Sequence, residues 1–409
     1  MIKNDPLEYA TESGPMGAIG ESSSFMLRVN RNCPWNRCLF CPVYKNKRFS
    51  NRSVEDLKHD IDAISRTHDL IMSISKSQNY ISSELLYEVV RRNPQIYGAI
   101  DTQPSYEQQQ ARHCLTNTAN WIFHGAKRIF LQDADALATK VVDLIKTINY
   151  IKSSFPDIDT ITCYARSKSC ARRSLEELAA LKHAGLTWCF IGVESGCDAV
   201  LEFMKKGVTR KDHIEAGNKL RQAGINMAAF VMPGLAGWEQ TISKKHIEDT
   251  IFVLNAMQPQ EIRIRSLAVL QQAPLYQRWK SGEFVAPTED SLVEEIRQLL
   301  EGIKVECTIE TLQMTNPVIC LKGPVGVKGK SELKQLGDYM ALSPIERARF
   351  NLQRYCRGGY LHFVEEWGGL DTELEQLINE AYISIEANAS NALKKVEKVL
   401  FAMKSAGIP

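Results

Sequence analysis

The sequence predicts an α/β protein built on a partial (β/α)6 TIM-like barrel, with a helical insertion after the first βα unit and a mostly helical C-terminal appendage. Between residues 24 and 267, short apolar runs alternate with longer amphipathic runs. This alternation is typical of βα units around a parallel sheet. The chain is also 409 residues long, which exceeds the size at which one hydrophobic core stops growing. We therefore expect a barrel with additional segments.

Six strands and five helices are expected in this part of the chain. The strands are residues 24–30, 128–132, 160–165, 188–193, 226–232 and 261–267, and the helices are residues 53–64, 137–154, 174–185, 209–224 and 246–257. Ser53 and Asp56 form a capping box for the first helix, and Gly185 and Gly224 are expected C-caps. In such a barrel, active-site residues gather at the C-terminal ends of the strands.

The pattern divides the chain into three parts. Residues 1–24 are expected to form an N-terminal extension, and residues 25–275 the barrel. Residues 66–124 show no strand pattern and are expected to be a helical insertion that covers the barrel mouth. Residues 276–409 are expected to form a mostly helical substrate or cap domain.

Composition narrows the classes of partner. The net charge is +2, from 50 Lys and Arg against 48 Asp and Glu, so a nucleic acid partner is unsupported. No apolar run reaches the roughly 18 residues of a membrane span, and the N-terminus lacks the apolar region of a signal peptide. We expect a cytoplasmic protein without a membrane partner. Its 11 cysteines are then mostly reduced, and a tight cluster of them indicates a metal or catalytic site.

Three cysteines, Cys33, Cys38 and Cys41, follow the first predicted strand with the spacing C-x4-C-x2-C. Three thiolates are one ligand short of a closed zinc site, for which His59 or His68 is a candidate fourth ligand. Cys38 and Cys41 have the spacing of a redox dithiol, which leaves Cys33 without a role. A [4Fe–4S] cluster held by three thiolates keeps one iron open for a small chelating ligand. The loop indicates a metal centre with these three alternatives.

The loop resembles that of the radical S-adenosylmethionine (SAM) superfamily, in which cysteines spaced C-x3-C-x2-C hold a [4Fe–4S] cluster and an aromatic residue precedes the last one. Phe40 occupies the aromatic position, and the first gap, Pro34 to Arg37, is one residue longer than usual. The resemblance implies that Cys33, Cys38 and Cys41 bind the cluster, and we expect the extra residue to form a bulge. It extends over residues 20–275 and is closest to the methylthiotransferase-like and coproporphyrinogen-oxidase-like branches.

Segments after the second and third predicted strands extend the resemblance. The segment LQDADAL, residues 131–137, stands where the superfamily grips the α-amino group of SAM. Gln132, Asp133 and Asp135 supply the acceptors that a protonated amine needs. Alternatively, Asp135 caps the helix that begins near Leu137. Arg166, after the third strand, is a candidate for the SAM carboxylate or for substrate.

The fourth and fifth strands lead into segments that are similar to SAM-binding segments of those branches. In GVESG, Glu194 matches the residue that contacts the SAM ribose hydroxyls, and Ser195 lies in the close turn beside it. Lys206 matches the basic residue that pairs with the SAM carboxylate, although a lysine at a helix end is often only solvated. In VMPGLAG, Val231, Met232 and Gly234 resemble the segment that lines the adenine.

Two arginines are candidates for substrate binding. Arg263 and Arg265 project from the same side of the last predicted strand because side chains alternate along a strand. We expect them to face the barrel lumen and an anionic substrate group, with an exposed edge strand as the alternative.

The resemblance implies an enzyme, an oxidoreductase or transferase with a [4Fe–4S] cluster and SAM as cofactors. The reduced cluster cleaves SAM to a 5′-deoxyadenosyl radical, which abstracts hydrogen from an unidentified small-molecule or peptide substrate. A one-electron reductase such as flavodoxin or ferredoxin is the implied partner. The alternative is a non-catalytic iron–sulfur or zinc protein that binds a protein or RNA partner.

The C-terminal part has three scattered cysteines, Cys307, Cys320 and Cys356. A buried thiol more often acts as a small apolar side chain than as a ligand, so we do not expect a second cluster there. Cys356 is a speculative hydrogen donor to a product radical, and a structural thiol is the more usual alternative.

Overall fold

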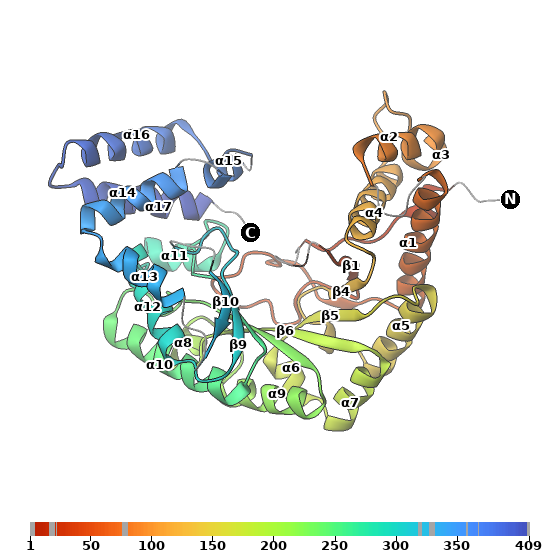
Figure 1. The fold of residues 1–409 in the computed structure, drawn as a ribbon, viewed down its shortest axis with the longest axis horizontal. Coiled ribbons are helices and arrows are strands. Elements are labelled where there is room, and N and C mark those ends of the chain that lie inside the picture. Colours follow the sequence, from red (N-terminus) through yellow and green to blue (C-terminus); the bar gives the residue numbers. More distant parts are fainter. Residues whose placement is uncertain are drawn as a thin grey trace. The chain divides into compact units, whose positions relative to one another are not determined.

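The chain folds into two compact units, seen in a computed structural model (Figure 1). The first contains residues 1–34, 46–190 and 219–226, and the second contains residues 35–45, 191–218 and 227–409. The structure describes residues 5–15, 21, 23–75, 81–317, 321–326, 332–356, 359–366 and 368–406. Cys320 lies outside them. Among the helices of these residues, none combines the length and apolar character needed to cross a membrane.

The first unit holds one end of a parallel sheet, in the strand order β1-β4-β5-β6. β1 pairs with β4, and β4 with β5, in parallel register. The strands are β1 (Phe25–Arg28), β4 (Arg128–Gln132), β5 (Thr160–Ala165) and the start of β6 (Leu186–Glu194); β2 (Asn30–Arg31) and β3 (Ser50–Asn51) form a separate small pair.

Helices accompany these strands and form an additional helical layer. The helices are η1 (Pro6–Tyr9), α1 (Val54–Ile74), α2 (Ser83–Arg92), α3 (Pro94–Tyr97), α4 (Tyr106–Phe123), η2 (Ala136–Ala138), α5 (Val141–Ser154), α6 (Ser167–Arg172) and α7 (Leu175–Ala184). Elements η1 and α1 to α4 share a buried apolar cluster that includes Tyr9, Ile71, Tyr97 and Leu115. Ser53 and Asp56 form the predicted capping box of α1, and Gly185, with φ 133°, ends α7 as predicted.

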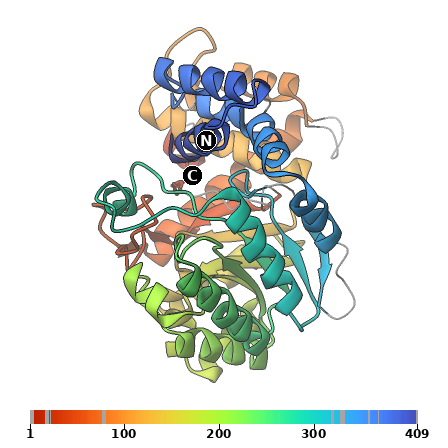
Figure 2. The ribbon, with the colours of Figure 1, turned by 90° about the vertical axis from the view of Figure 1, so that its left-hand side faces the viewer.

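The second unit continues the strand order as β6-β7-β8-β9-β10. β7 (Asn226–Val231), β8 (Glu261–Ile264) and β9 (Cys307–Glu310) pair in parallel, and β10 (Lys322–Val325) pairs antiparallel with β9. Figure 2 shows β9 and β10 as neighbouring arrows. The helices of the barrel region are α8 (Asp198–Phe203), α9 (Arg210–Gln222), α10 (Gln240–Met257), α11 (Pro274–Lys280) and α12 (Glu289–Gly302).

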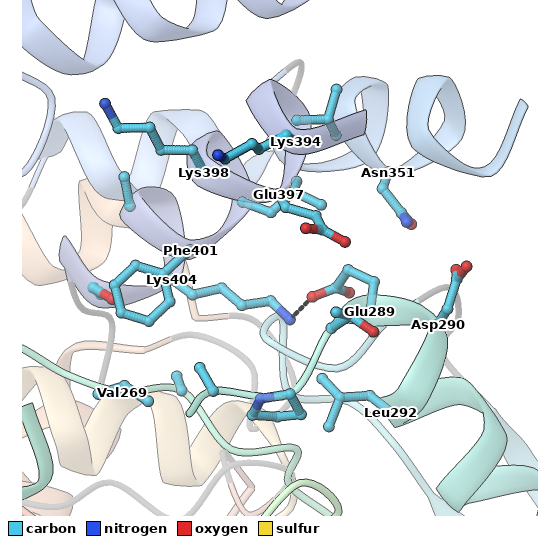
Figure 3. A pocket seen from close by; sticks show the side chains of 18 of the residues that line it. Val269, Glu289, Asp290, Leu292, Asn351, Lys394, Glu397, Lys398, Phe401 and Lys404 are labelled. Atoms are coloured by element: carbon cyan, nitrogen blue, oxygen red, sulfur yellow. Dashed lines mark hydrogen bonds and ion pairs between the residues drawn. The ribbon is translucent and has the colours of Figure 1, made fainter. Parts of the chain in front are cut away.

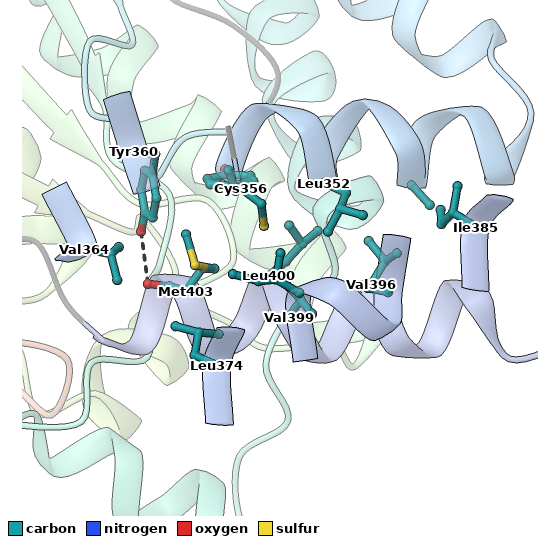
Figure 4. Close-up of a cluster of buried hydrophobic side chains, with 14 of the residues drawn as sticks. Leu352, Cys356, Tyr360, Val364, Leu374, Ile385, Val396, Val399, Leu400 and Met403 are labelled. Atoms are coloured by element: carbon teal, nitrogen blue, oxygen red, sulfur yellow. Dashed lines mark hydrogen bonds between the residues drawn. The ribbon is translucent and has the colours of Figure 1, made fainter. Parts of the chain in front are cut away.

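The last five helices lie in the C-terminal part of the chain, and α14 to α17 share a core of their own. The five helices are α13 (Glu332–Ala341), α14 (Pro344–Cys356), α15 (Gly359–Glu366), α16 (Thr372–Glu386) and α17 (Ala392–Ala406). Figure 4 shows Leu352, Val396, Val399 and Met403 meeting between α14 and α17. The thiol of Cys356 lies in this core, and burial raises its pKa to about 12. This placement favours the structural alternative for Cys356.

The predicted fold class, a mostly parallel α/β partial barrel with a helical C-terminal region, is confirmed. Each of the six predicted strands is present within a few residues of its expected bounds. Two further strands, β9 and β10, extend the sheet beyond the prediction. Helix α10 begins six residues earlier than expected, at Gln240 in place of His246, and α5 begins at Val141 after the short helix η2.

Candidate functional site

In the second unit, the cysteine loop packs against the turn that follows α8. The backbone N–H of Leu39 donates to the carbonyl of Met204 at 2.9 Å. The indole Nε1 of Trp35 donates to the carbonyl of Lys205 at 2.7 Å. A Cβ at Gly207, whose φ is 71°, would lie 2.3 Å from the Trp35 ring. Glycine is therefore required where this loop crosses the turn.

The loop has a tight internal geometry. Lys45 Nζ donates to the carbonyls of Asn36 and Cys38 at 3.0 and 2.8 Å, and Asn36 has a left-handed φ of 48°. This left-handed residue lies in the predicted bulge between the first two cysteines. Cys38 and Cys41 belong to the second unit and Cys33 to the first, and all three are partly buried.

The described residues, which include Cys33, Cys38 and Cys41, do not form a metal site as they are arranged in the structure. In the part of the chain that the structure describes, no group of three or more His, Cys, Asp or Glu side chains is arranged to hold a metal ion. On α1, His59 lies 3.8 Å from Asp60, and His68 lies 3.2 Å from Asp69. The arrangement of Cys33 with Cys38 and Cys41, and the bulge between them, stay predictions.

The structure brings Glu194 and Lys206 together in the second unit. Lys206 Nζ donates to Glu194 Oε1 at 2.9 Å, and both residues are buried, with 8% exposed. The same ammonium group lies 5.7 Å from the centre of the Phe40 ring in the cysteine loop. A Cβ at Gly192 would lie 2.5 Å from Glu194 Oε1 and 2.8 Å from Lys206 Nζ. Gly192 thus leaves the space in which a carboxylate and an ammonium group meet beside the loop.

Glu194 has an unusual backbone conformation. Its φ is 63°, a left-handed value that costs a non-glycine residue of order 1–3 kcal/mol and that is often found at functional sites. The strained peptide is held from two sides. The carbonyl of Glu194 accepts from the N–H of Met232 at 3.0 Å, and Ser195 N–H donates to the carbonyl of Val193 at 2.8 Å.

A buried histidine joins the Glu194 segment to the Met232 segment. His246 Nδ1 lies 2.8 Å from Ser195 Oγ, and His246 Nε2 lies 3.2 Å from the Met232 carbonyl. A carbonyl only accepts, so Nε2 carries the proton and Nδ1 accepts from the Ser195 hydroxyl. The Ser195 oxygen in turn accepts from Cys197 N–H at 3.0 Å. Burial lowers the pKa of His246 to about 4, so the ring is neutral near pH 7.

The segment around Gly234 is held by a buried carboxyl group. Glu295 Oε2 accepts from the N–H of Gly234, and Oε1 accepts from the hydroxyl of Ser243, each at 2.5 Å. Burial raises the pKa of Glu295 to about 7. Gly234 has φ 83°, and a Cβ there would lie 2.5 Å from Leu292 and 2.6 Å from Pro287. Gly234 is therefore fixed by both conformation and space.

The two predicted substrate arginines, Arg263 in β8 and Arg265 just after its end, lie near the ring of Phe230. The guanidinium carbons of Arg263 and Arg265 lie 5.9 and 4.5 Å from the ring centre. Arg263 is paired with Glu261 at 2.5 Å and lies 3.5 Å from Glu310. Among the described residues, the buried Nη2 atom of Arg265 has no hydrogen-bond partner. Arg265 thus keeps a donor for an anionic group, whereas Arg263 is neutralised by carboxylates.

In the first unit, Asp133 is bound by an arginine that the sequence did not single out. Arg28 donates to Asp133 Oδ2 from Nε at 2.9 Å and from Nη2 at 2.7 Å. The N–H of Asn32 donates to the same oxygen at 2.9 Å. Gly14 lies close to this group, since a Cβ there would lie 2.8 Å from Asp133 Oδ1 and 2.9 Å from Gln132 Oε1. Gly14 therefore leaves the space that the Oδ1 atom of Asp133 and the amide oxygen of Gln132 occupy.

Asp135 is fully buried at the end of β4. Its carboxylate accepts from the Arg166 N–H at 3.3 Å and from the Ser169 hydroxyl. Burial raises the pKa of Asp135 to about 6. Asp135 precedes η2 but makes no capping hydrogen bond with its side chain, so its alternative role as a helix cap is wrong. It ties the end of β4 to the start of α6, where Arg166 is the N-cap residue.

Sequence reasoning missed the residues that hold this geometry, namely Arg28, Gly192, His246 and Glu295. A charged residue inside the apolar run of β1 was a usable signal for Arg28, because such a residue needs a partner when it is half-buried. His246 and Glu295 lie on helices and carried no distinguishing pattern.

The chain matches the radical SAM superfamily over residues 27–243, which is more than half of its length. The protein belongs to the radical SAM superfamily. This superfamily uses a [4Fe–4S] cluster and SAM, as the resemblance implied. The chemistry of the donor side chains suits both groups, although among the described residues no three of them are arranged to hold a metal ion. Three partly buried thiols lie in one loop, and the paired Glu194 and Lys206 supply a carboxylate for hydroxyls and an ammonium group for a carboxylate.

Relatives within the superfamily share only part of their length with this chain. The tRNA uridine(34) acetyltransferase of Methanocaldococcus jannaschii is 29% identical over 131 residues, which cover 32% of this chain and 24% of the relative. Elongator complex protein 3 of Homo sapiens is 27% identical over 161 residues, covering 39% and 28%. The chain thus spans about a quarter of the length of these relatives.

Two solved structures show a distant similarity to this chain, and one of them is described as a radical SAM enzyme. Coproporphyrinogen III oxidase from Escherichia coli superimposes with a TM-score of 0.41 at 12% identity, covering 72% of this chain and 57% of that one. Methylornithine synthase gives 0.39 at 11% identity, covering 80% and 84%.

Proposed function

We propose that this protein cleaves SAM reductively at a [4Fe–4S] cluster and abstracts hydrogen from a nucleoside of tRNA. The observation that carries the first part is the buried Glu194–Lys206 pair, which the structure places against Phe40 of the cysteine loop. When bound, the cluster and SAM supply a 5′-deoxyadenosyl radical. The work of the chain is to bind, orient and shield these groups.

Each predicted residue has a role in this proposal. Cys33, Cys38 and Cys41 hold the cluster. Glu194 accepts from the ribose hydroxyls of SAM, and Lys206 turns from Glu194 to the SAM carboxylate. In this exchange Lys206 keeps a charged partner and Glu194 keeps hydrogen-bond donors, which matters because a buried ion that loses its partner is strongly destabilising.

The remaining residues position the other parts of SAM and the substrate. Val231, Met232 and Gly234 line the adenine, and Gln132, Asp133 and Asp135 accept from the amino group directly or through water. Arg265 donates from its unpartnered Nη2 atom to an anionic group of the substrate. Arg166 and Arg263 are secondary candidates, since Arg263 already contacts Glu261 and Glu310. A flavodoxin or ferredoxin supplies the electron.

The choice of tRNA follows from the relatives and revises the expectation from composition. A net charge of +2 gave no support for nucleic acid, yet both relatives named above are tRNA uridine acetyltransferase or elongator proteins. Net charge describes the whole surface, whereas phosphate binding needs only a local group of cations. A small molecule or a peptide, expected from the sequence, is the other outcome of the test.

The test is formation of 5′-deoxyadenosine under anaerobic conditions. The protein is reconstituted with iron and sulfide, reduced with dithionite and mixed with SAM, with and without bulk tRNA. We expect 5′-deoxyadenosine from the wild type and an increase with tRNA. Cys38→Ala should lose both the cluster absorbance and the product, whereas the matched control Cys356→Ala should keep both. A reduced, fully loaded protein that gives no 5′-deoxyadenosine would overturn the proposal.

A further inference from the structure

The second unit contains a cavity of about 790 Å³ that the superfamily resemblance does not use. Its walls come from the segment after β8 and from helices α11, α12, α14 and α17, and Figure 3 shows it from close by. A volume of this size is within the range of small-molecule binding sites in proteins.

A buried ion pair stands in the cavity wall. Lys404 on α17 donates to Glu289 at the start of α12, as the dashed line in Figure 3 marks. The exposed fractions of these side chains are 7% and 9%. The other carboxylate oxygen of Glu289 accepts from the Tyr355 hydroxyl at 3.3 Å. The pair places a strong donor next to a strong acceptor in an apolar surrounding, where hydrogen bonds to a ligand are strengthened.

Two more buried polar atoms line the same cavity without a partner among the described residues. They are Asn351 Oδ1 and Ser405 Oγ. The Asn351 amide is oriented by its Nδ2 group, which donates to the Tyr339 hydroxyl at 2.8 Å. Buried polar atoms normally have a hydrogen-bond partner. A ligand with complementary groups would satisfy both atoms.

Three aromatic side chains give the cavity an apolar part besides its polar groups. The rings of Trp279 and Phe401 stack at 4.2 Å with an interplanar angle of 25°, and Tyr276 lies 5.2 Å from Trp279. All three residues line the cavity. Stacked aromatic rings favour a planar ring over a flexible chain as the next member of the stack.

Acidic and basic residues line the cavity in equal numbers. The acidic residues are Glu289, Asp290, Glu373 and Glu397, and the basic residues are Arg347, Lys394, Lys398 and Lys404. Burial, followed by the nearby Asp290, raises the pKa of Glu397. The occupant that suits this lining is uncharged, with hydrogen-bonding groups on one edge.

The cavity also borders the segment proposed to line the adenine. Pro287 and Leu292, which line the cavity, are the residues that a Cβ at Gly234 would strike. Helix α12 carries Glu289 at its first position and Glu295, which holds the Gly234 N–H, less than two turns later. Helix α12 therefore contacts both the cavity and the segment around Gly234.

We propose that this cavity binds a nucleobase, with its ring on the Trp279–Phe401 surface and its polar edge on Glu289, Lys404, Asn351 and Ser405. The inference rests on the proposed function for its substrate class. Enzymes that act on a base read its polar edge by hydrogen bonds and its face by stacking. The base can belong to a free nucleoside or to a nucleotide of RNA whose phosphates stay outside the neutral interior.

The test measures binding of uridine, cytidine, adenosine and guanosine, and of a short single-stranded RNA, by titration calorimetry on the reconstituted protein. Ser405→Ala removes one hydrogen bond and should raise the Kd of the bound probe about five-fold. Lys404→Met should raise it at least ten-fold. Lys395→Met is the matched control on α17, since Lys395 pairs with Glu380 at 3.0 Å away from the lining, and should leave the Kd unchanged.

The outcomes separate the two proposals. Binding of a free nucleoside that weakens in Ser405→Ala identifies a nucleoside, and the same effect with RNA alone identifies an RNA nucleotide. Absence of binding, or equal binding by wild type and Ser405→Ala, overturns the cavity proposal. Formation of 5′-deoxyadenosine from SAM alone is measured on the same samples, so the radical activity is tested independently of the cavity proposal. An unchanged unfolding midpoint confirms that Ser405→Ala is folded.

Discussion

The Glu194–Lys206 pair allows a quantitative test of the site. At 2.9 Å, two unit charges in an effective dielectric constant of about 20 attract by about 6 kcal/mol. Desolvation offsets much of this attraction, but removal of one partner leaves a buried charge. Because the side chains are only 10% and 11% exposed, we expect Lys206→Met and Glu194→Gln each to lower the free energy of unfolding by about 3 kcal/mol.

The double variant separates this mechanism from simple loss of packing. With both charges removed, no buried charge is left unpaired, and the combined loss should be at least about 2 kcal/mol smaller than the sum of the single losses. The assay is urea unfolding followed by circular dichroism. Lys205→Met is the matched control, because Lys205 is exposed and should change stability by less than about 0.5 kcal/mol. Additive losses would refute the reasoning.

Three further predictions concern other residues of the candidate site. Glu295→Gln keeps an acceptor for Gly234 but cannot ionise. Since the folded pKa of about 7 exceeds the ordinary 4.5, the free energy of unfolding of the wild type should fall by about 3 kcal/mol relative to that of the variant as pH rises from 4.5 to 8. An equal difference in stability between the two proteins at both pH values would contradict this. Gly192→Ala should cost about 1–2 kcal/mol and weaken SAM binding in calorimetry, whereas Gly337→Ala, whose Cβ meets nothing within 4 Å, should not. Asp133→Asn and Asp135→Asn should weaken SAM binding with iron content unchanged; loss of iron or of the fold would indicate a structural role.

Apolar runs predicted the strands because parallel strands are buried on both faces. The same rule explains why β10 was missed. β10 has the sequence KGPV with mostly exposed or partly exposed residues, and glycine and proline in a strand are tolerated chiefly at an edge. Similarly, the burial pattern of α10 begins at His246, although the helix begins at Gln240. The exposed first turns of α10 have no periodic apolar residues from which a helix could be predicted.

The candidate site was predictable where its residues belong to short segments in a fixed order after the strands. Contacts between distant segments were not predictable. Arg28 meets Asp133 over 105 residues of sequence, His246 meets Ser195 over 51, and Glu295 meets Gly234 over 61. Such pairs depend on how elements pack, which no local pattern encodes. The sequence thus indicated candidate cofactor-binding residues, but it did not indicate the residues that hold these candidates in place.

The imidazole of His246 has a consequence for how SAM would be sensed. It donates to the carbonyl of Met232 and accepts from Ser195, so it links the proposed adenine and ribose contacts through one rigid ring. With a pKa of about 4, the ring carries no charge that could switch this link off at cellular pH. Recognition of the adenine and the ribose would therefore be cooperative. A fragment such as adenine or ribose alone should bind with far less than half of the binding free energy of the whole nucleoside.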